Sequence, residues 1–501
     1  MKKILLCALL FTALQTFAQA PAIQWQKCYG GTGNENANSI AQTNDGGYII
    51  AGYTNSTNGD VVSNHGGNDY WVVKIDNTGT IEWQKTYGGT FDDQANSVIQ
   101  TTDGGYIVAG YSDSNNGDIT NDHGDKDYWI IKLDAVGTIE WQHKYGGDDK
   151  ESAYEIRQTT DGGYIVAGQT YSYDGNIRVV NGDVTNFHGF IDGWLVKLSS
   201  TGVLEWEKSL GATDEDNFMT VQQTADGGYI AAGEHAYYGY WVVKCNSLGA
   251  IQWEYADTDG NIVHSIKQTP DGGYIVTGDT ITRIGNSTGH NFGVTKLNAL
   301  GGLEWKKSYG GDGFFDVPRS IQLTPDGGYI LTGVTNSDWS GNVGPSNGSQ
   351  DMWVLKLSET GILQWQKCLG GTTYDGASEI QLTADLGYIV AGFAQSNNGN
   401  VTGNHGASDF WIVKLAPDSR LLETENIVKD QNTISFYPNP AKEKITFTET
   451  AANATVFTMI GTKVLEVQNT KELNVLGLQK GNYMLKITTD KGTSYKKLLK
   501  E

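Results

Sequence analysis

The sequence predicts an all-β protein whose main part is a seven-bladed β-propeller. Three observations lead to this prediction: a repeated turn, two repeated Trp columns and an incomplete repeat at each end of the array. The 501-residue chain contains 65 Gly, 26 Tyr and 14 Trp but only 8 Pro, and 18% of its residues are charged. This composition favours many short strands joined by tight turns over helices.

One unit is repeated seven times along the chain. Its most regular element is the turn Asp-Gly-Gly-Tyr, which occurs six times, followed by one copy of Asp-Leu-Gly-Tyr. These turns begin at Asp45, Asp103, Asp161, Asp226, Asp271, Asp326 and Asp385. Two Trp columns accompany the turn, and Phe292 takes one place in the second column. Trp339 alone lies outside both columns, which we interpret as packing between blades.

Each unit contains four runs that favour strands, named a, b, c and d. In the first unit they cover residues 39–43, 48–53, 70–75 and 81–87. A tight glycine turn joins a to b, a long polar loop joins b to c, and a second short turn joins c to d. A lone four-stranded sheet cannot bury both faces, so we expect the repeated sheets to stack around an axis.

The two ends of the array predict how it closes. The array begins with an unpaired d strand at residues 23–29 and ends with an unpaired c strand at residues 410–415. Adding the first strand to the last sheet completes the seventh blade and leaves no open edge. We therefore predict a propeller over residues 21–416 that is closed by its N-terminal outer strand.

The repeat resembles two known propeller repeats. An apolar strand a, an Asp-Gly turn and an aromatic-rich strand c are similar to the WD-type repeat. The unit is more similar to the secreted Gly/Trp-rich propeller repeats of Bacteroidetes surface proteins. It departs from the WD pattern where Gly88-Gly89 follows strand d in place of Gly-His. The structural His of that family therefore has no counterpart here.

The N-terminus and the net charge limit where the protein acts. Residues 1–20 are typical of a signal peptide, with Lys2 and Lys3, an apolar run and a small-x-small site that ends at Ala20. No later segment approaches 18 apolar residues, so we expect no transmembrane segment. A net charge of -22 without a basic stripe excludes nucleic-acid binding. We predict a secreted protein, located outside the cell or on the outer-membrane surface.

The composition changes after the propeller. Residues 21–420 carry a net charge of -26, whereas residues 421–501 carry +2, and such an asymmetry marks separate modules. We predict a linker at residues 417–432 and a C-terminal module at 433–501, with strand-like runs at 444–447, 455–459 and 483–487.

This module resembles the type A C-terminal sorting domain of the type IX secretion system. The matching residues are Tyr437, Pro438, Asn439, Pro440, Gly461, Gly481, Tyr483, Lys496 and Lys497. The resemblance implies a small Ig-like β-sandwich, export across the outer membrane and removal by a cell-surface sortase. The secretion machinery and its sortase would then be partners of the chain. An accessory β domain without an address function is the alternative.

The b–c loops contain a repeated acidic pattern beside a Trp. Asp, His and Asp recur at matching positions, at Asp60, His65, Asp69, Asp118, His123, Asp127, Asp183, His188 and Asp192. Carboxylate and imidazole groups could bind a metal there, and the acidic d–a connections on the same face would suit Ca²⁺. The same residues could instead hold the loop through hydrogen bonds. A pattern copied over several blades favours this architectural role.

Ligand contacts are predicted where the repeats differ from one another. One column of the inner strand varies from blade to blade and contains Tyr154, His264 and Arg319. Trp339 lies in a Gly/Ser/Asn-rich loop and is the best candidate for an exposed aromatic contact. These four residues are the predicted ligand-binding residues.

The leading functional hypothesis is a non-catalytic binding module for a glycan or a protein. The first alternative is a polysaccharide-acting enzyme on the acidic loop face, because Glu155 and Glu379 lie on inner strands. The second alternative is a structural surface component. No catalytic motif is present in the sequence, and the repeat pattern does not identify the ligand.

Overall fold

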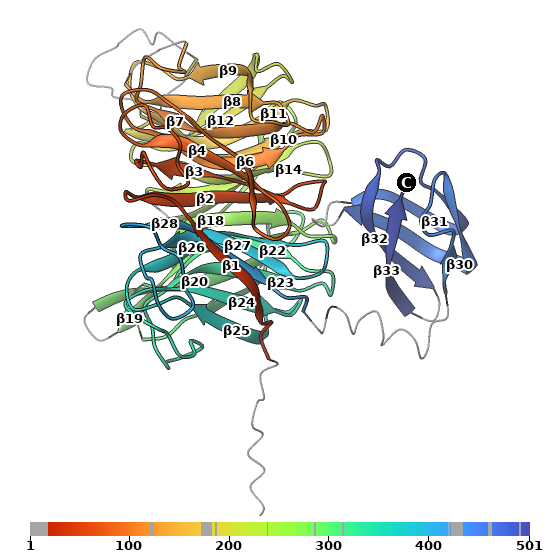
Figure 1. Cartoon of the computed structure of the whole chain (residues 1–501). Helices are drawn as coiled ribbons and strands as arrows, with labels where there is room; N and C mark the ends of the chain where they lie inside the picture. Colours follow the sequence, from red (N-terminus) through yellow and green to blue (C-terminus); the bar gives the residue numbers. More distant parts are fainter. Residues whose placement is uncertain are drawn as a thin grey trace, which may run out of the picture.

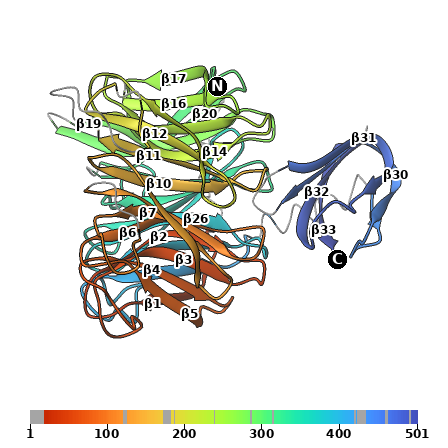
Figure 2. The same cartoon turned by 90° about the horizontal axis from the view of Figure 1, so that it is seen from above.

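In the computed structural model, the described residues are 19–120, 125–171, 183–185, 188–237, 239–284, 287–312, 315–418, 421, 434–458, 463–489 and 492–501. Within them the chain is all-β and forms seven four-stranded sheets and one five-stranded sheet. Figures 1 and 2 show the seven sheets as one propeller-like array and the C-terminal sheet as a separate module. The predicted signal peptide falls almost entirely outside the described residues.

Each blade contains four antiparallel strands in the order a, b, c, d. Blade 1 contains β2 (Glu35–Gln42), β3 (Tyr48–Thr54), β4 (Asp69–Ile75) and β5 (Ile81–Tyr87). Blade 2 contains β6 (Asp93–Gln100), β7 (Tyr106–Ser112), β8 (Asp127–Leu133) and β9 (Ile139–Tyr145). Blade 3 contains β10 (Glu151–Gln158), β11 (Tyr164–Tyr171), β12 (Ile191–Leu198) and β13 (Leu204–Leu210). Blade 4 contains β14 (Asn217–Gln223), β15 (Tyr229–His235), β16 (Gly239–Cys245) and β17 (Ile251–Asp257).

The remaining blades follow the same order, and blade 5 has the longest strands. Blade 5 contains β18 (Gly260–Gln268), β19 (Tyr274–Ile284), β20 (Ser287–Leu297) and β21 (Leu303–Tyr309). Blade 6 contains β22 (Val317–Leu323), β23 (Tyr329–Thr335), β24 (Asp351–Leu357) and β25 (Leu363–Leu369). Blade 7 contains β26 (Asp375–Leu382), β27 (Tyr388–Ala394), β28 (Asp409–Leu415) and the N-terminal strand β1 (Ile23–Tyr29).

The N-terminal strand joins the last sheet, as the sequence predicts. β1 pairs with β28 in antiparallel register, with Lys27 opposite Ile412. The inner strand of each blade contacts the inner strand of the next, and β26 contacts β2. One hydrophobic cluster contains both Trp71 of blade 1 and Phe410 of blade 7. Blades 1 and 7 are therefore packed neighbours.

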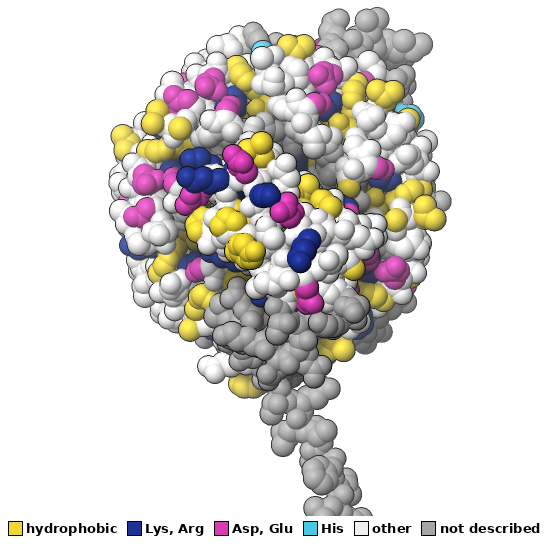
Figure 3. Space-filling view, turned by 90° about the vertical axis from the view of Figure 1, so that its right-hand side faces the viewer, with side chains coloured by type: hydrophobic (Ala, Val, Ile, Leu, Met, Phe, Trp, Pro, Cys, Tyr) yellow, Lys and Arg dark blue, Asp and Glu magenta, His cyan; other side chains and the backbone are white. Residues whose placement is uncertain are grey.

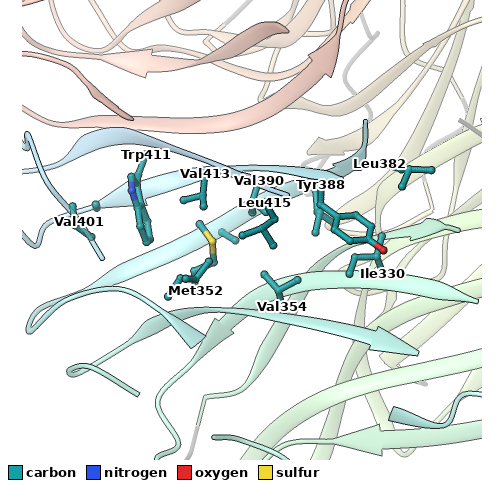
Figure 4. Close-up of a cluster of buried hydrophobic side chains, with 14 of the residues drawn as sticks. Ile330, Met352, Val354, Leu382, Tyr388, Val390, Val401, Trp411, Val413 and Leu415 are labelled. Carbon is teal, nitrogen blue, oxygen red and sulfur yellow. The ribbon is translucent and has the colours of Figure 1, made fainter. Parts of the chain in front are cut away.

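The apolar core lies between neighbouring blades. The Trp side chains of strand c are buried, and Trp71 stacks on Phe410 with ring centroids 4.5 Å apart. Figure 4 shows the cluster between blades 6 and 7, in which Met352 lies near Trp411 and Val354 lies across from Leu415. The interpretation of the Trp columns as packing between blades is confirmed, but the place predicted for Phe292 is wrong. Gly293 lies opposite Gly278, as Trp71 lies opposite Gly52, and Phe292 takes the position before it.

The glycine turn explains one regular feature of the sequence. Gly46 of the first a–b turn has a φ of 90°, a conformation that glycine adopts without strain. In the seventh copy Leu386 takes this place with a φ of 65°. The Asp of the turn also stabilises its own loop. Asp45 Oδ1 accepts a hydrogen bond from the backbone N–H of Gly47 at 2.9 Å.

A buried Lys column connects these turns to strand c. In blade 2, Lys132 Nζ lies 3.0 Å from Asp103 Oδ2 and donates to the carbonyl of Leu133 at 3.1 Å. Lys is present at this position in all seven blades, at Lys74, Lys132, Lys197, Lys244, Lys296, Lys356 and Lys414. The ammonium group satisfies the turn carboxylate and a carbonyl together, so each turn is attached to its own sheet.

The C-terminal module is one five-stranded sheet. Its strands are β29 (Phe436–Tyr437), β30 (Lys444–Thr458), β31 (Lys463–Asn474), β32 (Gly481–Thr489) and β33 (Gly492–Lys500). The two predicted runs at 444–447 and 455–459 belong to a single long strand, because β30 continues through an irregular register between Thr446 and Ala451. Its apolar core includes Phe447, Leu485 and Leu498.

The predicted linker begins with residues that still pack on the propeller. Asp418 Oδ2 accepts a hydrogen bond from Trp365 Nε1 at 3.0 Å, and Leu421 is buried in the cluster of blades 6 and 7. The remainder of the predicted linker lies outside the described residues. Contacts to the propeller therefore extend several residues past strand c of blade 7.

Candidate binding site at the loop face

The b–c loops and the d–a connections lie at the same end of the strands, and we call this end the loop face. Strand b ends and strand a begins there, so the variable loops of all blades meet at one side of the channel lined by the inner strands. Variable loops on a rigid scaffold commonly carry the binding function of a fold. The predicted site residues are therefore located relative to this face.

The structure divides the repeated Asp/His/Asp pattern into two parts. His65 Nδ1 lies 2.8 Å from Asp69 Oδ2, and the backbone N–H of His65 donates to the same oxygen. Asp60 turns away from this pair and accepts from the backbone N–H of Gly30, at the end of β1, at 3.1 Å. The His and the second Asp meet, whereas the first Asp connects its loop to the neighbouring blade.

The other copies show the same division. Asp118 Oδ2 accepts from the N–H of Gly88 at 3.1 Å. His188 Nδ1 lies 3.6 Å from Asp192 Oδ2, and the N–H of Asp183 donates to the carbonyl of Gly146. His123 lies outside the described residues. In blade 2 the ammonium of Lys144 lies 3.0 Å from Asp127 Oδ2.

These contacts are the hydrogen bonds of an architectural clasp. Over the described part of the chain, no group of three or more His, Cys, Asp or Glu side chains is arranged to hold a metal ion. The metal and Ca²⁺ assignments stay predictions.

The acidic d–a connections are less exposed than the sequence suggests. The last acid of most connections is buried, and these acids are Glu35, Asp93, Glu151, Asp216, Asp316 and Asp375. Each accepts a backbone N–H from the turn that precedes it, as Asp93 does from Gly89 at 2.7 Å and Glu151 from Gly147 at 3.0 Å. These acids cap turns in the interior, so only the remaining acids of the rim face solvent.

Burial changes the acidity of these caps. Burial raises the pKa of Glu151 to about 8, and the neighbouring carboxylate of Asp127 raises it further. Burial likewise raises the pKa of Asp93 to about 6. The carboxyl group of Glu151 is therefore largely protonated at neutral pH.

Two sets of equivalent positions surround the channel at the loop face, and we call them the channel mouth. The first set follows the strand-b glycine and contains Tyr53, Tyr111, Gln169, Glu234, Asp279, Val334 and Phe393. The second is the variable inner-strand column, with Asn38, Asn96, Tyr154, Met219, His264, Arg319 and Ser378. Because every blade supplies equivalent positions, the chemistry of the channel mouth can be compared from blade to blade, and it differs among them.

Blades 5 and 6 supply a polar cluster to the channel mouth. His264 Nε2 lies 3.0 Å from Asp279 Oδ1, and His290 Nδ1 lies 3.2 Å from Asp279 Oδ2. Arg319 Nη1 lies 3.5 Å from His264 Nδ1. A guanidinium only donates, so His264 accepts at Nδ1 and donates through Nε2–H to Asp279. Asp279 thereby orients His264 through a hydrogen bond, and His290 lies close to its other oxygen.

The electrostatics of this cluster differ from those of the clasps. Burial lowers the pKa of His264, and Arg319 lowers it further against the opposing effect of Asp279, so the imidazole is neutral at neutral pH. Burial also raises the pKa of Glu234 on the adjacent blade. Arg319 is exposed, and within the described ranges it forms no ion pair. It therefore presents a cation whose charge no carboxylate neutralises directly.

Blades 1 to 3 supply aromatic side chains to the channel mouth. Tyr53 and Tyr111 follow the strand-b glycines of blades 1 and 2, and Tyr154 lies in the inner-strand column of blade 3. Lys126 Nζ lies 3.7 Å from the centroid of the Tyr111 ring. All three Tyr side chains are half-buried, so their rings are partly open to the channel mouth.

Exposed aromatic residues continue from the polar cluster over the loop face. Phe315 stacks on His290 with an interplanar angle of 5°, and 55% of Phe315 is exposed. Its backbone N–H donates to Asn336 Oδ1, in the loop that contains Trp339. Trp339 is 75% exposed and has a φ of 48°. Phe315 therefore lies beside the polar cluster through His290, and Trp339 is a second exposed aromatic residue in the adjoining loop.

Part of this site was predictable from the sequence. His264, Arg319, Tyr154 and Trp339 were predicted, and the structure brings the first two together. Asp279 and His290 were missed, although comparison of the residues that follow each strand-b glycine would have indicated Asp279.

The acids considered for catalysis connect neighbouring blades. Glu155 Oε2 accepts from Thr220 Oγ1 and the N–H of Val221, each at 2.6 Å. Glu379 Oε2 makes the equivalent contacts to Ser39 Oγ and the N–H of Ile40. Burial opposes ionisation of Glu155, but Arg157 and Lys267 outweigh it and lower its pKa. Glu155 is therefore ionised at neutral pH and unsuited to donate a proton.

Part of the sorting motif packs at the edge of the C-terminal sheet that the terminal strand β33 forms. Asn439 Nδ2 donates to the carbonyl of Lys497 at 2.9 Å, and its Oδ1 accepts from the N–H of Leu499 at 2.8 Å. Tyr483 donates through its hydroxyl to the carbonyl of Gln479 at 2.9 Å.

Within this edge, Asn439 connects the Tyr437–Pro440 turn to the terminal strand. Gly481 begins β32, and Lys496 lies on β33. Gly461 lies outside the described residues.

Figure 3 shows lysines and acids interspersed on the face of the molecule turned toward the viewer.

Comparisons with known structures show only distant similarity. The chain is 10% identical to the extracellular domain of BT4673 from B. thetaiotaomicron, with a TM-score of 0.41. The match covers 97% of this chain and 59% of the BT4673 domain. The biofilm matrix protein Bap1 of V. cholerae is 9% identical over 80% of this chain and 92% of its own, with a TM-score of 0.36.

A third similar structure is the α-L-arabinofuranosidase Arb93a of Fusarium graminearum, 10% identical over 78% of this chain and 94% of its own, with a TM-score of 0.40. Similarity of this degree transfers neither a ligand nor an activity. No curated protein matches the chain.

One family model matches, and it covers the C-terminal module. Residues 435–501 match the secretion system C-terminal sorting domain. A search of the described residues for helices long and apolar enough to cross a membrane finds none. The predicted identity of the module is confirmed by the family match and by the Asn439 contacts of its motif. The chain therefore carries a type IX sorting domain at its C-terminus and is a secreted or cell-surface protein.

Proposed function

We propose that the chain is a secreted, closed seven-bladed propeller that binds a glycan at the channel mouth. The pairing of β1 with β28 and the contact of β26 with β2 support the closed ring. The observation that carries the binding proposal is the asymmetry of the mouth. One side has partly open Tyr rings, and the other has a polar cluster held by Asp279.

This combination suits a sugar. Aromatic rings stack against the apolar faces of sugars, and a few oriented polar groups give such sites their specificity. The exposed Phe315 and Trp339 extend the aromatic surface outward, which would allow a ligand of several sugar units. A glycan therefore uses both sides of the mouth as well as the rim.

A glycan array with the mature chain tests the proposal. We expect specific binding that falls at least about tenfold for Trp339→Ala and Phe315→Ala, in line with the loss of one well-stacked aromatic contact. Both side chains are largely exposed, so the melting temperature of each variant should stay unchanged. Val62→Ala, at an exposed residue of another b–c loop, is the matched control.

The same array distinguishes the alternatives. Loss of binding in EDTA would support Ca²⁺ in the loops, and no change would count against it. Turnover of a bound polysaccharide would favour the enzyme hypothesis, for which the low pKa of Glu155 is unfavourable. An empty array would contradict glycan binding and favour a protein ligand or a structural surface role.

A further inference from the structure

We propose that the channel mouth recognises a sugar that carries a carboxylate, with Arg319 as the residue that binds this group. The inference rests on the proposed glycan binding and adds the class of sugar. Three features of the described residues carry it: an exposed guanidinium without an ion pair, a neutral imidazole beside it, and the absence of an acid at the two neighbouring positions of the inner-strand column.

Arg319 has donors available for a ligand. Its contact with His264 Nδ1 is long, at 3.5 Å, and uses one N–H of the guanidinium. The remaining N–H groups of the fork match the geometry of a carboxylate, which binds guanidinium in bidentate fashion. Arg319 is an exposed residue of the variable inner-strand column.

The surroundings explain why the site remains available. Asp279 is the nearest acid of the cluster, but both of its oxygens face imidazoles, His264 at 3.0 Å and His290 at 3.2 Å. The inner-strand neighbours of Arg319 in the column are His264 and Ser378, neither of which is an acid. A ligand carboxylate at Arg319 would therefore meet the guanidinium without a direct competitor.

The overall charge limits the size of the ligand. Residues 21–420 carry a net charge of -26, so a long polyanion would be repelled by the whole domain. A short saccharide with one or two carboxylates avoids most of this repulsion. Its ring would lie toward Phe315 or the Tyr side of the mouth, which makes a uronic-acid oligosaccharide the best match.

Calorimetric titration of the mature chain with digalacturonate and with neutral digalactose tests this proposal. We expect tighter binding of digalacturonate, and a loss of about tenfold or more for Arg319→Gln, because charge-assisted hydrogen bonds contribute more than neutral ones. Arg319→Lys should retain part of the affinity. Digalactose should bind the wild type and the variants alike.

Lys27→Gln is the control matched for net charge, since Lys27 is exposed on the outer strand β1. Unchanged melting temperatures would show that the variants are folded. Equal affinity for both disaccharides, or an Arg319→Gln variant that binds digalacturonate as tightly as the wild type, would overturn the assignment while leaving glycan binding intact. If neither disaccharide binds to a protein that binds other glycans, the assignment of Arg319 is also overturned. An empty glycan array would reject the proposed function itself.

Discussion

The buried acid caps make the stability of the propeller depend on pH, and Glu151 is the strongest case. Its side chain is only 1% exposed, accepts from Gly147 and Thr170, and has its pKa raised from 4.5 to about 8 by burial and by Asp127. An acid whose pKa is raised on folding stabilises the folded state below its unfolded pKa. This stabilisation is lost as the pH rises from about 4.5 through about 8.

The size of the effect follows from the shift. Each pKa unit corresponds to about 1.4 kcal/mol, so the full transition costs roughly 5 kcal/mol at pH above the folded pKa. We expect Glu151→Gln to be slightly less stable than the wild type at pH 5, because one acceptor oxygen is replaced by a donor. At pH 9 the order should reverse, since Gln does not ionise.

Thermal unfolding of both proteins between pH 4 and 9 measures this difference. With at most about 2 °C per kcal/mol for a chain of this size, the difference in melting temperature should change by several degrees and cross zero. Asp93→Asn is a second variant for comparison, because the pKa of Asp93 is raised only to about 6. The change in its melting-temperature difference from the wild type should therefore be complete near neutral pH. Parallel curves for Glu151→Gln and the wild type would refute the reasoning.

Three further changes test the architecture. Lys356→Met removes the ammonium that lies 2.8 Å from Asp326 Oδ2 and should lower the free energy of unfolding by about 3 kcal/mol; a denaturation midpoint equal to that of the wild type would contradict a role for the Lys column. Gly370→Ala places a methyl group against Asp351 Oδ1 and should destabilise the chain by about 2 kcal/mol or more, and a stable, soluble variant with an unchanged melting temperature would show that the turn can move. Trp353→Ala empties a fully buried site and should cost about 3–5 kcal/mol in denaturant titrations, whereas a loss below 1 kcal/mol would argue against tight packing between blades.

Much of the fold was predictable because it rests on local patterns that recur seven times. Strand positions, the glycine turns and the strand-c Trp residues are all readable from spacing, and the place of β1 follows from the incomplete repeats at the ends. The buried Lys column was not identified, although it is equally regular. A Lys such as Lys132 ordinarily indicates a solvated position, and its burial depends on a turn carboxylate that the spacing alone does not place beside it.

The acidic residues of the loop face show a second limit. Asp92 and Asp93 are neighbours in the sequence, yet Asp93 is fully buried while Asp92 remains near the surface. The difference comes from the N–H of Gly89, which only the backbone of the folded turn directs at Asp93. Sequence patterns identify an acidic segment, but they do not tell which carboxylate caps a turn.

Blade 5 gives the strongest argument that the channel mouth has a function. In a repeat protein the other blades act as internal controls, because each carries the same element in the same surroundings. Blade 5 departs from the common register of strand c at three positions. Gly293 lies opposite Gly278, where blade 1 has Trp71, Phe292 takes the position before it, and Asn291 replaces the buried Asp. Its b and c strands are also the longest of the propeller, and they bring His290 to Asp279. These departures lie close to the Asp279 carboxylate, which contacts His264 and His290 and lies near the exposed Arg319, and oriented polar groups of this kind are what a binding site requires.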